Sequence, residues 1–454
     1  MSAPTLHKSP GKSTGIRPEK SPERTVAFYT LGCRTNQLES AAMAELFKTA
    51  GWQVVPFEDA AGLVVVNTCT VTERSDVEAR RIIRRARLAN PMARIAVTGC
   101  YAQVAPDEVA DLDGVNFVIG NNFKQDITDI IQRAPVSEAP LVRVSEMDKS
   151  RMMVGAAEAG LDRTRGSLKI QDGCDYKCTY CIIWEARGAS RSLPADDLVN
   201  HLTRMHWEGF REIMLTGINI GQYQHGDQDL AGLLRTLSAV PGDFRLRLSS
   251  LDPLEVTEDL IATVAGSGGK ICPYFHLAAQ TAEDSQLKRM ARRHHVADML
   301  GACERIATLM PGAAIRSDII VGFPGESDAL FETTCRNLAL AGFNGLHVFS
   351  YSKRRGTPAA AMAGQVPERT KKARAQALRA FSEAQDLAWR TAMTGQRRRV
   401  LVESCGLKAI SPENVRITLM DGRGGPLREP LPANSWQTVT LGAPSATETP
   451  GWLT

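Results

Sequence analysis

The stretch Cys174-Asp175-Tyr176-Lys177-Cys178-Thr179-Tyr180-Cys181 decides how the middle of this sequence is interpreted. Its three cysteines are four and three positions apart and follow a short apolar run at 168–171 that predicts a strand. Thiolates at this spacing on one loop can bind three corners of an iron–sulfur cubane and leave the fourth iron open to a small molecule. A closed zinc site needs a fourth ligand, and the sequence has no fourth cysteine nearby. We therefore expect an iron–sulfur cluster on Cys174, Cys178 and Cys181, with structural zinc as the less favoured alternative.

A strand and a helix alternate six times between residues 167 and 393. Six repeats are two short of a complete β/α barrel, so we predict a partial, laterally open (β/α)6 barrel. Reactive groups of such barrels lie on the loops that follow strands, and the cysteine run occupies the first of these loops. The expected strands are 168–171, 212–216, 245–249, 274–277, 315–321 and 346–351. The expected helices are 195–207, 229–239, 257–265, 297–309, 328–340 and 368–393.

Residues 25–134 also alternate between short apolar strands and amphipathic helices, which predicts a parallel α/β domain. We expect its strands at 26–30, 63–67, 94–98 and 115–119, and a helix that begins at a Ser75/Glu78 capping box. Three further cysteines follow three of these strands. Parallel strands end at one edge of a sheet, so Cys33, Cys69 and Cys100 can converge and share one cluster. Ordinary buried cysteines are the alternative for these three, and packing is our assignment for Cys272, Cys303, Cys335 and Cys405.

The remaining segments carry weaker patterns. Residues 394–454 contain short β-like pieces at 399–403, 415–420 and 437–441 separated by Gly and Pro, which predicts a small β-barrel. Residues 1–24 are rich in Ser, Pro, Gly and Lys, which predicts a disordered tail. The stretch 135–166 has little periodicity and is interpreted as a linker.

Composition limits the classes of function. Of the 454 residues, 43% are hydrophobic and 23% charged, as in ordinary soluble proteins. No apolar run approaches the roughly 20 residues of a membrane span, so we expect no membrane role. Ten cysteines without an export signal favour metal ligation over disulfides and place the protein in the reducing cytoplasm. The net charge of +4 is small, so nucleic-acid contacts would have to come from local clusters of Lys and Arg.

The cysteine run has the form Cys-x3-Cys-x-aromatic-Cys and resembles the motif of the radical S-adenosylmethionine (SAM) enzymes. The flanking segments Lys-Ile-Gln-Asp-Gly (169–173) and Arg-Gly-Ala-Ser-Arg-Ser (187–192) are similar to the methylthiotransferases, one branch of that superfamily. The resemblance implies an N-terminal α/β domain, a radical SAM barrel and a C-terminal RNA-binding TRAM barrel. It also implies two [4Fe-4S] clusters, one on Cys174, Cys178 and Cys181 that binds SAM, and one on Cys33, Cys69 and Cys100 that carries the sulfur to be inserted. SAM would serve as both methyl donor and radical source.

The same resemblance implies a SAM pocket at the strand ends. Tyr180 would shield the cluster from water, and the turn 322–325 would let backbone approach the ligand. Satisfied hydrogen bonds at strand ends are the alternative role for the polar residues. The residues expected to contact the cofactor are Tyr180, Thr216, Gly217, Asn219, Ser249, Ser250, Asp318 and Gly322.

Basic residues suggest an RNA substrate. They cluster on one helix (Arg80, Arg81, Arg84, Arg85, Arg87), at 289–293 (Arg289, Arg292, Arg293) and at Arg397, Arg398 and Arg399. Such clusters suit phosphate contacts, although solvated helix faces are often basic too.

Segments 67–72, 215–221 and 347–352 most resemble the enzymes that modify threonylcarbamoyladenosine at position 37 of tRNA. That resemblance implies methylthiolation of the adenine C2 carbon in the anticodon loop, with an electron donor such as flavodoxin or ferredoxin and a sulfur source as partners. Trp184-Glu185 and Gln280-Thr281-Ala282 depart from the family pattern, and both are expected near the pocket. The alternatives are isopentenyladenosine 37 of tRNA, an Asp of a ribosomal protein, and a non-catalytic zinc-bearing RNA-binding protein.

Overall fold

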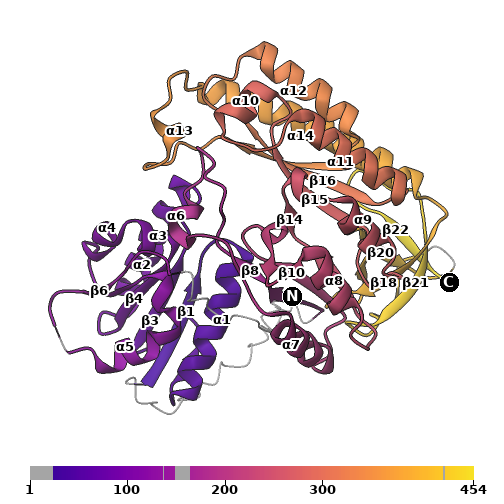
Figure 1. The fold of residues 1–454 in the computed structure, drawn as a ribbon. Coiled ribbons are helices and arrows are strands. Elements are labelled where there is room, and N and C mark those ends of the chain that lie inside the picture. The colour runs from indigo at the N-terminus through magenta and orange to yellow at the C-terminus, as the bar shows by residue number, and fades with distance from the viewer. Residues whose placement is uncertain (1–23, 136, 149–163, 423–424) are drawn as a thin grey trace, which may run out of the picture.

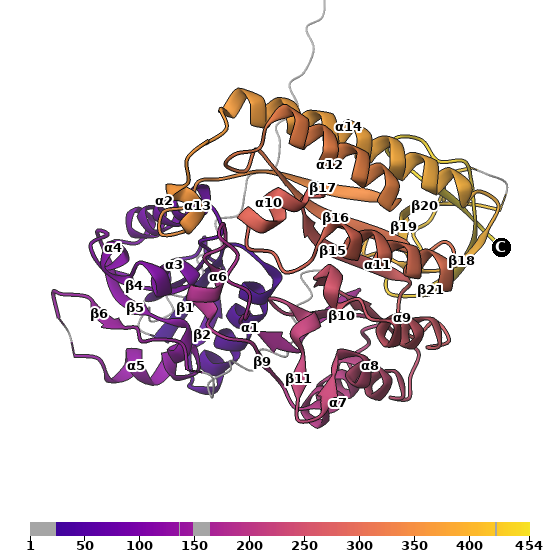
Figure 2. The same ribbon diagram turned by 45° about the horizontal axis from the view of Figure 1, so that its top comes forward.

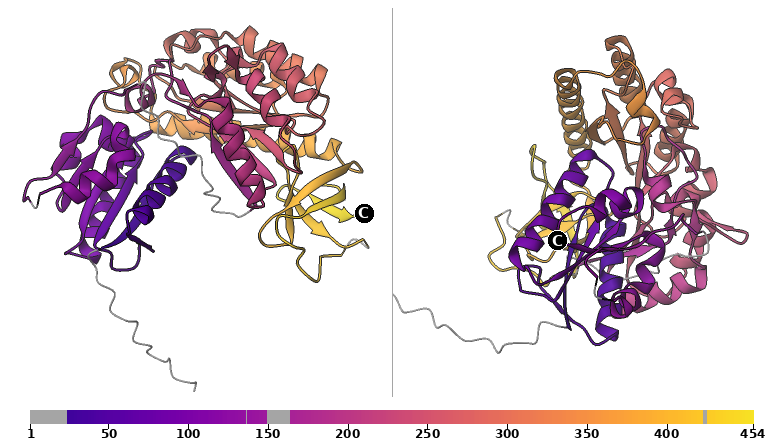
Figure 3. Two further views of the ribbon diagram at one scale, coloured as in Figure 1. Left: turned by 60° about the horizontal axis from the view of Figure 1, so that its bottom comes forward. Right: turned by 90° about the vertical axis from the view of Figure 1, so that its left-hand side faces the viewer.

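The computed structural model describes residues 24–135, 137–148, 164–422 and 425–454. These residues form an N-terminal α/β block, a middle block of parallel strands with outer helices, and a small C-terminal barrel (Figure 1). The first and last blocks lie at opposite ends of the middle block (Figure 3). Almost all of the expected tail at 1–24, and residues 136 and 149–163 of the expected linker, lie outside the described residues.

The N-terminal block is built on one parallel sheet with the strand order β2-β1-β3-β4-β5-β6. The central strand β3 is buried at every position, as its run of valines predicts. The strands are β1 Thr25–Thr30, β2 Gln53–Val55, β3 Leu63–Thr68, β4 Arg94–Gly99, β5 Val115–Ile119 and β6 Leu141–Arg143. The helices are α1 Arg34–Thr49, α2 Glu73–Ala89, α3 Cys100–Val104, α4 Pro106–Ala110 and α5 Ile127–Arg133, with a 3-10 turn η2 at Asn121–Asp126.

Three expectations for this region are wrong. Strand β2 was not predicted, and strand β6 lies inside the stretch interpreted as a linker, where it pairs with β5. Each has only three residues, too few to show a period of two. Helix α2 begins at Glu73 rather than at Ser75, because Thr72 is the N-cap and its hydroxyl accepts a hydrogen bond from the backbone N–H of Ser75 at 3.2 Å.

The middle block is a partial barrel of parallel strands (Figure 2). Its strands pair in the orders β13-β10-β7 and β14-β15-β16-β17, and Leu246 of β13 forms an isolated parallel bridge with Ile271, three residues before β15 begins. Within the described residues β7 and β17 do not pair with each other, so the barrel is open at the side as predicted. The strands are β7 Arg165–Lys169, β10 Glu212–Thr216, β13 Arg245–Leu248, β14 Ser250–Leu251, β15 Tyr274–Gln280, β16 Ala314–Val321 and β17 Gly345–Ser350.

Helices cover the outside of this barrel. All six predicted helices are present, with ends shifted by no more than one residue. They are α7 Ala195–Trp207, α8 Leu230–Ser238, α9 Glu258–Ala265, α11 Val296–Leu309, α12 Asp328–Ala341 and α14 Glu368–Ala392. Shorter elements lie on the connecting loops: β8 Gln171–Asp172, α6 Ile183–Arg187, β9 Arg191–Ser192, η3 Ile220–Gln222, β11 Gln224–His225, β12 Gln228–Asp229, η4 Pro253–Glu255, α10 Asp284–Arg289 and α13 Pro358–Ala361.

Side chains of strand β16 alternate between the outer and inner faces of the barrel wall. Ile315, Ile319 and Val321 are buried in the outer hydrophobic core, whereas Arg316, Asp318 and Ile320, which alternate with them, are only half-buried. One of these alternate residues, Asp318, lies beside His347 of β17 in the parallel register. The inner face is therefore partly accessible at the open side of the barrel.

The C-terminal block is a closed barrel in the strand order β18-β19-β20-β22-β21, as predicted. Its strands are β18 Arg397–Val402, β19 Lys408–Ile410, β20 Arg416–Met420, β21 Trp436–Leu441 and β22 Pro450–Leu453. The sequence did not indicate β19 and β22, which have three and four residues. No helix in the described ranges is long and apolar enough to cross a membrane.

Two buried arginines attach this barrel to the middle block. Arg245 and Arg247 of β13 both bind Glu212, with closest contacts of 2.6 and 2.9 Å. Their remaining N–H groups donate to backbone carbonyls of the C-terminal barrel at Ile410, Ser411 and Pro412. Every charge in this contact is therefore paired or hydrogen-bonded.

Candidate active site

A cavity of about 310 Å³ is lined by six of the ten cysteines. Cys33, Cys69 and Cys100 reach it from the loops and helix start that follow β1, β3 and β4. Cys174, Cys178 and Cys181 reach it from the loop after β8. We call these sets the N-terminal triad and the loop triad. The structure brings together two triads that are distant along the chain, at residues 33–100 and 174–181.

Close packing of loops positions the N-terminal triad. Gly32 and Gly99 both have left-handed backbone, with φ of +93° and +96°. A Cβ atom on Gly32 would collide with Cys69, and one on Gly99 would collide with the backbone of Thr68. The side-chain amide of Asn36 ties the loops together, because it donates to the carbonyls of Leu31 at 2.8 Å and Thr68 at 2.9 Å.

The thiols of this triad differ in exposure. Cys33 is exposed, whereas Cys69 and Cys100 are buried. Burial raises the pKa of Cys69 to about 11 and also raises the pKa of Cys100. Without a metal these two side chains are neutral thiols at pH 7, so metal binding must release their protons.

The loop triad is held by a sharp turn and by hydrogen bonds to sulfur. Gly173 has φ of +73°, and a Cβ atom there would collide with the backbone of Ala189. Each sulfur accepts at least one N–H hydrogen bond, which favours the thiolate that binds iron and partly offsets the burial that raises the pKa of Cys174 to about 11 and of Cys181 to about 12. The donors are Tyr176 N to Cys174 at 3.4 Å, Ile183 N to Cys181 at 3.4 Å, and the Arg292 guanidinium to Cys178 at 3.5 Å.

The cofactor residues expected from the sequence divide into two sets. Tyr180, Gly217, Asn219 and Ser250 line the cysteine cavity, and Asp318 lines a second cavity beside it. Thr216, Ser249 and Gly322 line neither of these cavities in the described structure. The turn at Gly322 is filled by protein instead, because its N–H donates to Glu326 at 2.8 Å and a Cβ atom would collide with Lys371.

The second cavity, of about 270 Å³, adjoins the first on the inner face of β16 and β17. The two cavities share Val71, Tyr180, Cys181, Ile183 and Gln280. Gln280 has φ of +67°, a strained conformation for a residue other than glycine. Such strain is retained where the surroundings fix a side chain for function.

We expected both segments that depart from the family pattern, 184–185 and 280–282, to lie near the pocket, but only Gln280 lines either cavity in the described structure. Gln280 lines both cavities, but Thr281 hydrogen-bonds Thr334 and Ala282 packs in the hydrophobic core. Trp184 lies 5.4 Å from the ammonium group of Lys177 and, like Glu185, lines neither cavity. The departure at 184–185 therefore does not change the cavity wall directly.

A buried charge cluster joins the N-terminal block to the middle block, and sequence reasoning missed it. Glu39 of α1, only 2% exposed, pairs with Lys124 at 2.5 Å, Arg187 at 2.8 Å and Lys169 at 2.9 Å. Asp172 accepts hydrogen bonds from Lys169 at 2.7 Å and from Arg187 at 3.0 Å. Burial alone would raise the pKa of Glu39, but the three cations hold it well below its usual value. The spacing of four between Glu39 and buried Met43 was the available signal, since it places the carboxylate on the buried helix face.

A second contact joins the same two blocks on another side of the cavity. Arg354, which follows β17, is buried and binds Asp76 and the hydroxyl of Thr70. Thr70 is the neighbour of Cys69 in sequence. The relative position of the two triads therefore depends on two buried ionic contacts between blocks.

The arginines of the basic clusters predicted to contact RNA differ in how exposed they are. Arg292 is buried against Cys178 and Asp252, so it is not available to phosphate, and Arg293 stacks on the ring of Tyr176 at 4.3 Å. Arg81 and Arg399 lie on the surface with acidic partners, Glu78 and Asp243.

Among the remaining cysteines, Cys272 and Cys303 are buried and Cys335 is half-buried. Cys405 is exposed in the turn after β18, so its assignment to packing is wrong.

Comparisons with known proteins agree with this geometry. Residues 25–120 match the uncharacterized protein family UPF0004, and residues 168–338 match the radical SAM superfamily. The structure resembles TsrM, a radical SAM methyltransferase from Kitasatospora setae, with a TM-score of 0.59 at 16% identity over 74% of this chain and 77% of that one, which supports the fold.

Curated relatives extend the similarity over most of the chain. A threonylcarbamoyladenosine tRNA methylthiotransferase MtaB from Thermotoga maritima is 36% identical over 85% of this chain and 88% of its own length. The protein of that name from Bacillus subtilis is 40% identical over 79% of this chain and 80% of its own length. A tRNA-2-methylthio-N(6)-dimethylallyladenosine synthase from Novosphingobium aromaticivorans is 35% identical over 86% and 89%. The chain therefore belongs to the radical SAM methylthiotransferases of the MtaB type.

Proposed function

We propose that this chain inserts a methylthio group at the C2 carbon of threonylcarbamoyladenosine 37 in tRNA. The observation that carries the proposal is the shared cavity, which exposes two cysteine triads to the same small volume. One triad alone would fit many radical SAM reactions. Two triads facing one cavity fit a reaction in which a radical and a sulfur donor must meet at the same carbon atom.

The donor sets fit the groups that this family uses. Membership of the radical SAM superfamily implies SAM and one [4Fe-4S] cluster. We assign that cluster to Cys174, Cys178 and Cys181, and a second [4Fe-4S] cluster to Cys33, Cys69 and Cys100. Each triad offers only sulfur ligands, and three of them, as a cubane with one open iron requires. When bound, these groups supply the reductive cleavage of SAM and the methylated sulfur.

The protein residues hold and shield this chemistry. The side-chain carbonyl of Gln171 accepts hydrogen bonds from the N–H groups of Ile218 and Asn219, both at 3.0 Å. The amide of Asn219 donates to Glu255 at 2.7 Å, and burial raises the pKa of Glu255 to about 6. We assign this fixed loop to the polar groups of SAM, and Tyr180 to exclusion of water from the loop triad.

The second cavity is our proposed site for the tRNA base. It lies at the open side of the barrel, between the loop triad and Val71 and Thr72 of the N-terminal block. Phe349 lines it and is 52% exposed, which suits stacking against an unpaired base. An anticodon-loop base can be presented there without opening a duplex.

The partners follow from the reaction. SAM cleavage needs an electron from a donor such as flavodoxin or ferredoxin, and repeated turnover needs a sulfur source. The third partner is the anticodon loop of the tRNA, and we expect the reaction with all three partners to take place in the cytoplasm.

Isopentenyladenosine is the nearest alternative substrate, because a synthase of the dimethylallyl compound is 35% identical. The MtaB relatives from Thermotoga and Bacillus, at 36% and 40%, favour the threonylcarbamoyl compound. An Asp of a ribosomal protein and a zinc-bearing binding protein have no comparable support.

Nucleoside mass spectrometry of tRNA tests the substrate. Cells that lack the gene should lose 2-methylthio-threonylcarbamoyladenosine, and the wild-type gene should restore it while Cys69→Ala should not. Persistence of that nucleoside in the deletion strain would refute the substrate assignment. Loss of the 2-methylthio isopentenyl compound in its place would establish the alternative.

A further inference from the structure

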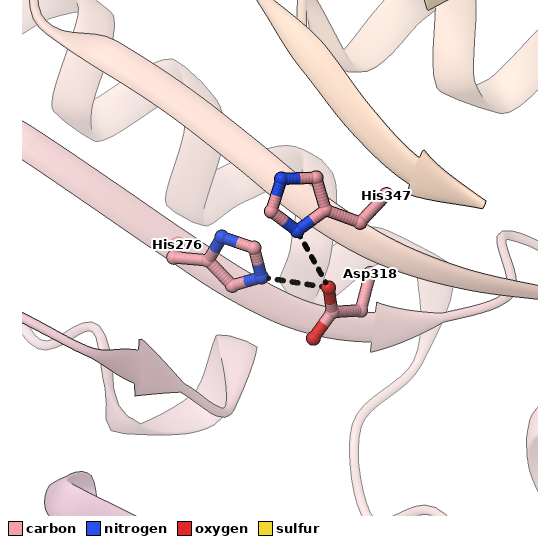
Figure 4. A group of neighbouring side chains, drawn as sticks. All are labelled: His276, Asp318 and His347. Carbon is pink, nitrogen blue, oxygen red and sulfur yellow. Dashed lines mark ion pairs between the residues drawn. The ribbon is translucent and has the colours of Figure 1, made fainter. Parts of the chain in front are cut away.

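Two histidines and an aspartate form a cluster on the inner wall of the barrel (Figure 4). Asp318 Oδ1 lies 2.9 Å from His276 Nε2 and 3.3 Å from His347 Nδ1. One ligand atom from each residue lies within 4.8 Å of the other two. Neither histidine lines the cysteine cavity, so the cluster is separate from both triads.

The sheet fixes this arrangement. His276, Asp318 and His347 come from the neighbouring parallel strands β15, β16 and β17, and Asp318 is the direct register partner of His347. His276 pairs with Arg316, two residues before Asp318, so all three side chains lie on the same face. Donors on three hydrogen-bonded strands are more rigidly placed than donors on loops.

The donor set and spacing suit a transition-metal ion. Two imidazoles and one carboxylate are ligands that Zn²⁺ and Fe²⁺ accept, with open positions left for other ligands. Metal–ligand bonds of about 2.0–2.2 Å place adjacent ligand atoms roughly 3 Å apart, as both pairs to Asp318 are.

The exposure and the charge of this cluster favour binding of a metal ion. His276 is buried, the Asp318 side chain is 24% exposed and the His347 side chain 52% exposed, so the cluster opens toward the lateral gap of the barrel. Arg316, two residues before Asp318 on the same strand face, is paired with Asp386 at 2.7 Å. That pairing leaves the carboxylate of Asp318 with no arginine or lysine partner among the described contacts.

We propose that His276 Nε2, Asp318 Oδ1 and His347 Nδ1 bind one divalent transition-metal ion, distinct from the iron–sulfur clusters. Because Asp318 also lines the second cavity, the open positions of the ion face the space that we assign to the substrate base. They would take a negatively charged oxygen ligand. Metal binding itself does not depend on the proposed function.

The test measures zinc binding by the holoenzyme with its iron–sulfur clusters loaded under anaerobic conditions. Equilibrium dialysis against Zn²⁺ should give about one zinc per chain above the iron content. His347→Ala removes a proposed ligand and should weaken zinc binding by at least the roughly 10- to 100-fold typical for loss of an outer-shell partner, and Asp318→Asn should also weaken it. His225→Ala removes an exposed histidine on β11, and zinc binding should be unchanged.

X-ray absorption at the zinc edge identifies the ligands. Nitrogen and oxygen neighbours at about 2.0–2.2 Å are expected, whereas sulfur neighbours at about 2.3 Å would place the ion on cysteines and overturn the proposal. Equal zinc binding by wild type and His347→Ala would overturn it as well. The iron and sulfide content of each variant shows whether it folds with both clusters loaded. The side chain of His347 is half-exposed, so His347→Ala should fold and can test the proposal even if Asp318→Asn does not fold.

Discussion

The two cysteine triads line one cavity but are assembled in different ways. The loop triad lies within eight consecutive residues, and each sulfur receives a hydrogen bond from within the middle block. The N-terminal triad comes from three loops of another block. Its distance from the loop triad is set by Glu39 with its cations and by Arg354 with Asp76. A local site depends on its own loop, whereas an assembled site depends on how two blocks dock.

The largest expected effect comes from removing one cysteine of either triad. Cys178→Ala should abolish SAM cleavage and tRNA modification together. Cys69→Ala should abolish modification while reductive SAM cleavage continues. In both variants iron should fall from about eight to about four atoms per chain, as measured after anaerobic reconstitution. Loss of SAM cleavage in Cys69→Ala would break the comparison, because it would make the two triads interdependent.

Glu39→Gln should separate docking from local assembly. The variant leaves Lys124, Lys169 and Arg187 without their shared carboxylate, and such a loss typically costs about 3–5 kcal/mol. We expect lower unfolding free energy in denaturant and lower iron occupancy of the N-terminal triad, with SAM cleavage retained. Glu45→Gln, at an exposed position on the same helix, is the matched control. An equal loss of iron from both triads would contradict the idea that only one depends on docking.

Glu212→Gln tests whether docking at the other end of the molecule matters to either triad. Two buried arginines overcome the effect of burial and hold the pKa of Glu212 at about 2, against an ordinary value near 4.5. The carboxylate therefore contributes about 3 kcal/mol above pH 4.5, and this is lost as pH falls toward 2. Denaturant unfolding of wild type and variant should differ most at neutral pH and converge in acid. A constant difference across that range would refute the assignment, and iron content at neutral pH should be unchanged.

Phe349→Ala should weaken use of tRNA without affecting either cluster. Loss of one stacked base costs about 1–3 kcal/mol, so KM for tRNA should rise roughly 10-fold. Leu340→Ala, which removes an exposed apolar side chain on α12, should leave KM unchanged. If KM is the same in both variants, the base does not stack on Phe349.

The smallest effect is expected on the surface of α2. Arg81 pairs with Glu78 on the exposed surface, where solvent and salt screen the attraction, so the pair contributes little to stability. Arg81→Ala should therefore unfold at nearly the wild-type denaturant concentration. A weaker dependence of tRNA binding on salt in this variant would add α2 to the RNA contact surface.

The sequence predicted those parts of the structure that local pattern determines. The helices of the barrel have long apolar stripes and clear ends, so helix 195–207 was predicted at its observed bounds. Short strands such as β6 have too few residues to show a period, and one was mistaken for linker. The N-terminal triad could be predicted because parallel strands end at one edge.

The contacts between blocks could not be predicted in the same way. The pairing of Glu39 with Arg187 joins residues 148 positions apart and exists only when the blocks dock. Arg292 was interpreted as a surface cation because sequence alone does not reveal that it is buried beside Cys178. The position of Asp318 between two histidines likewise required the register of three strands.

The attachment of the C-terminal barrel has a consequence for domain exchange. Arg245 and Arg247 bind it through the main-chain carbonyls of residues 410–412, which every amino acid provides. The contact with the two arginines therefore uses the backbone of this segment, while the buried side chains of Ile410 and Ser411 pack within the barrel. A replacement barrel would have to keep the backbone at 410–412 for the two arginines, and also side-chain contacts such as that of Arg399 with Asp243.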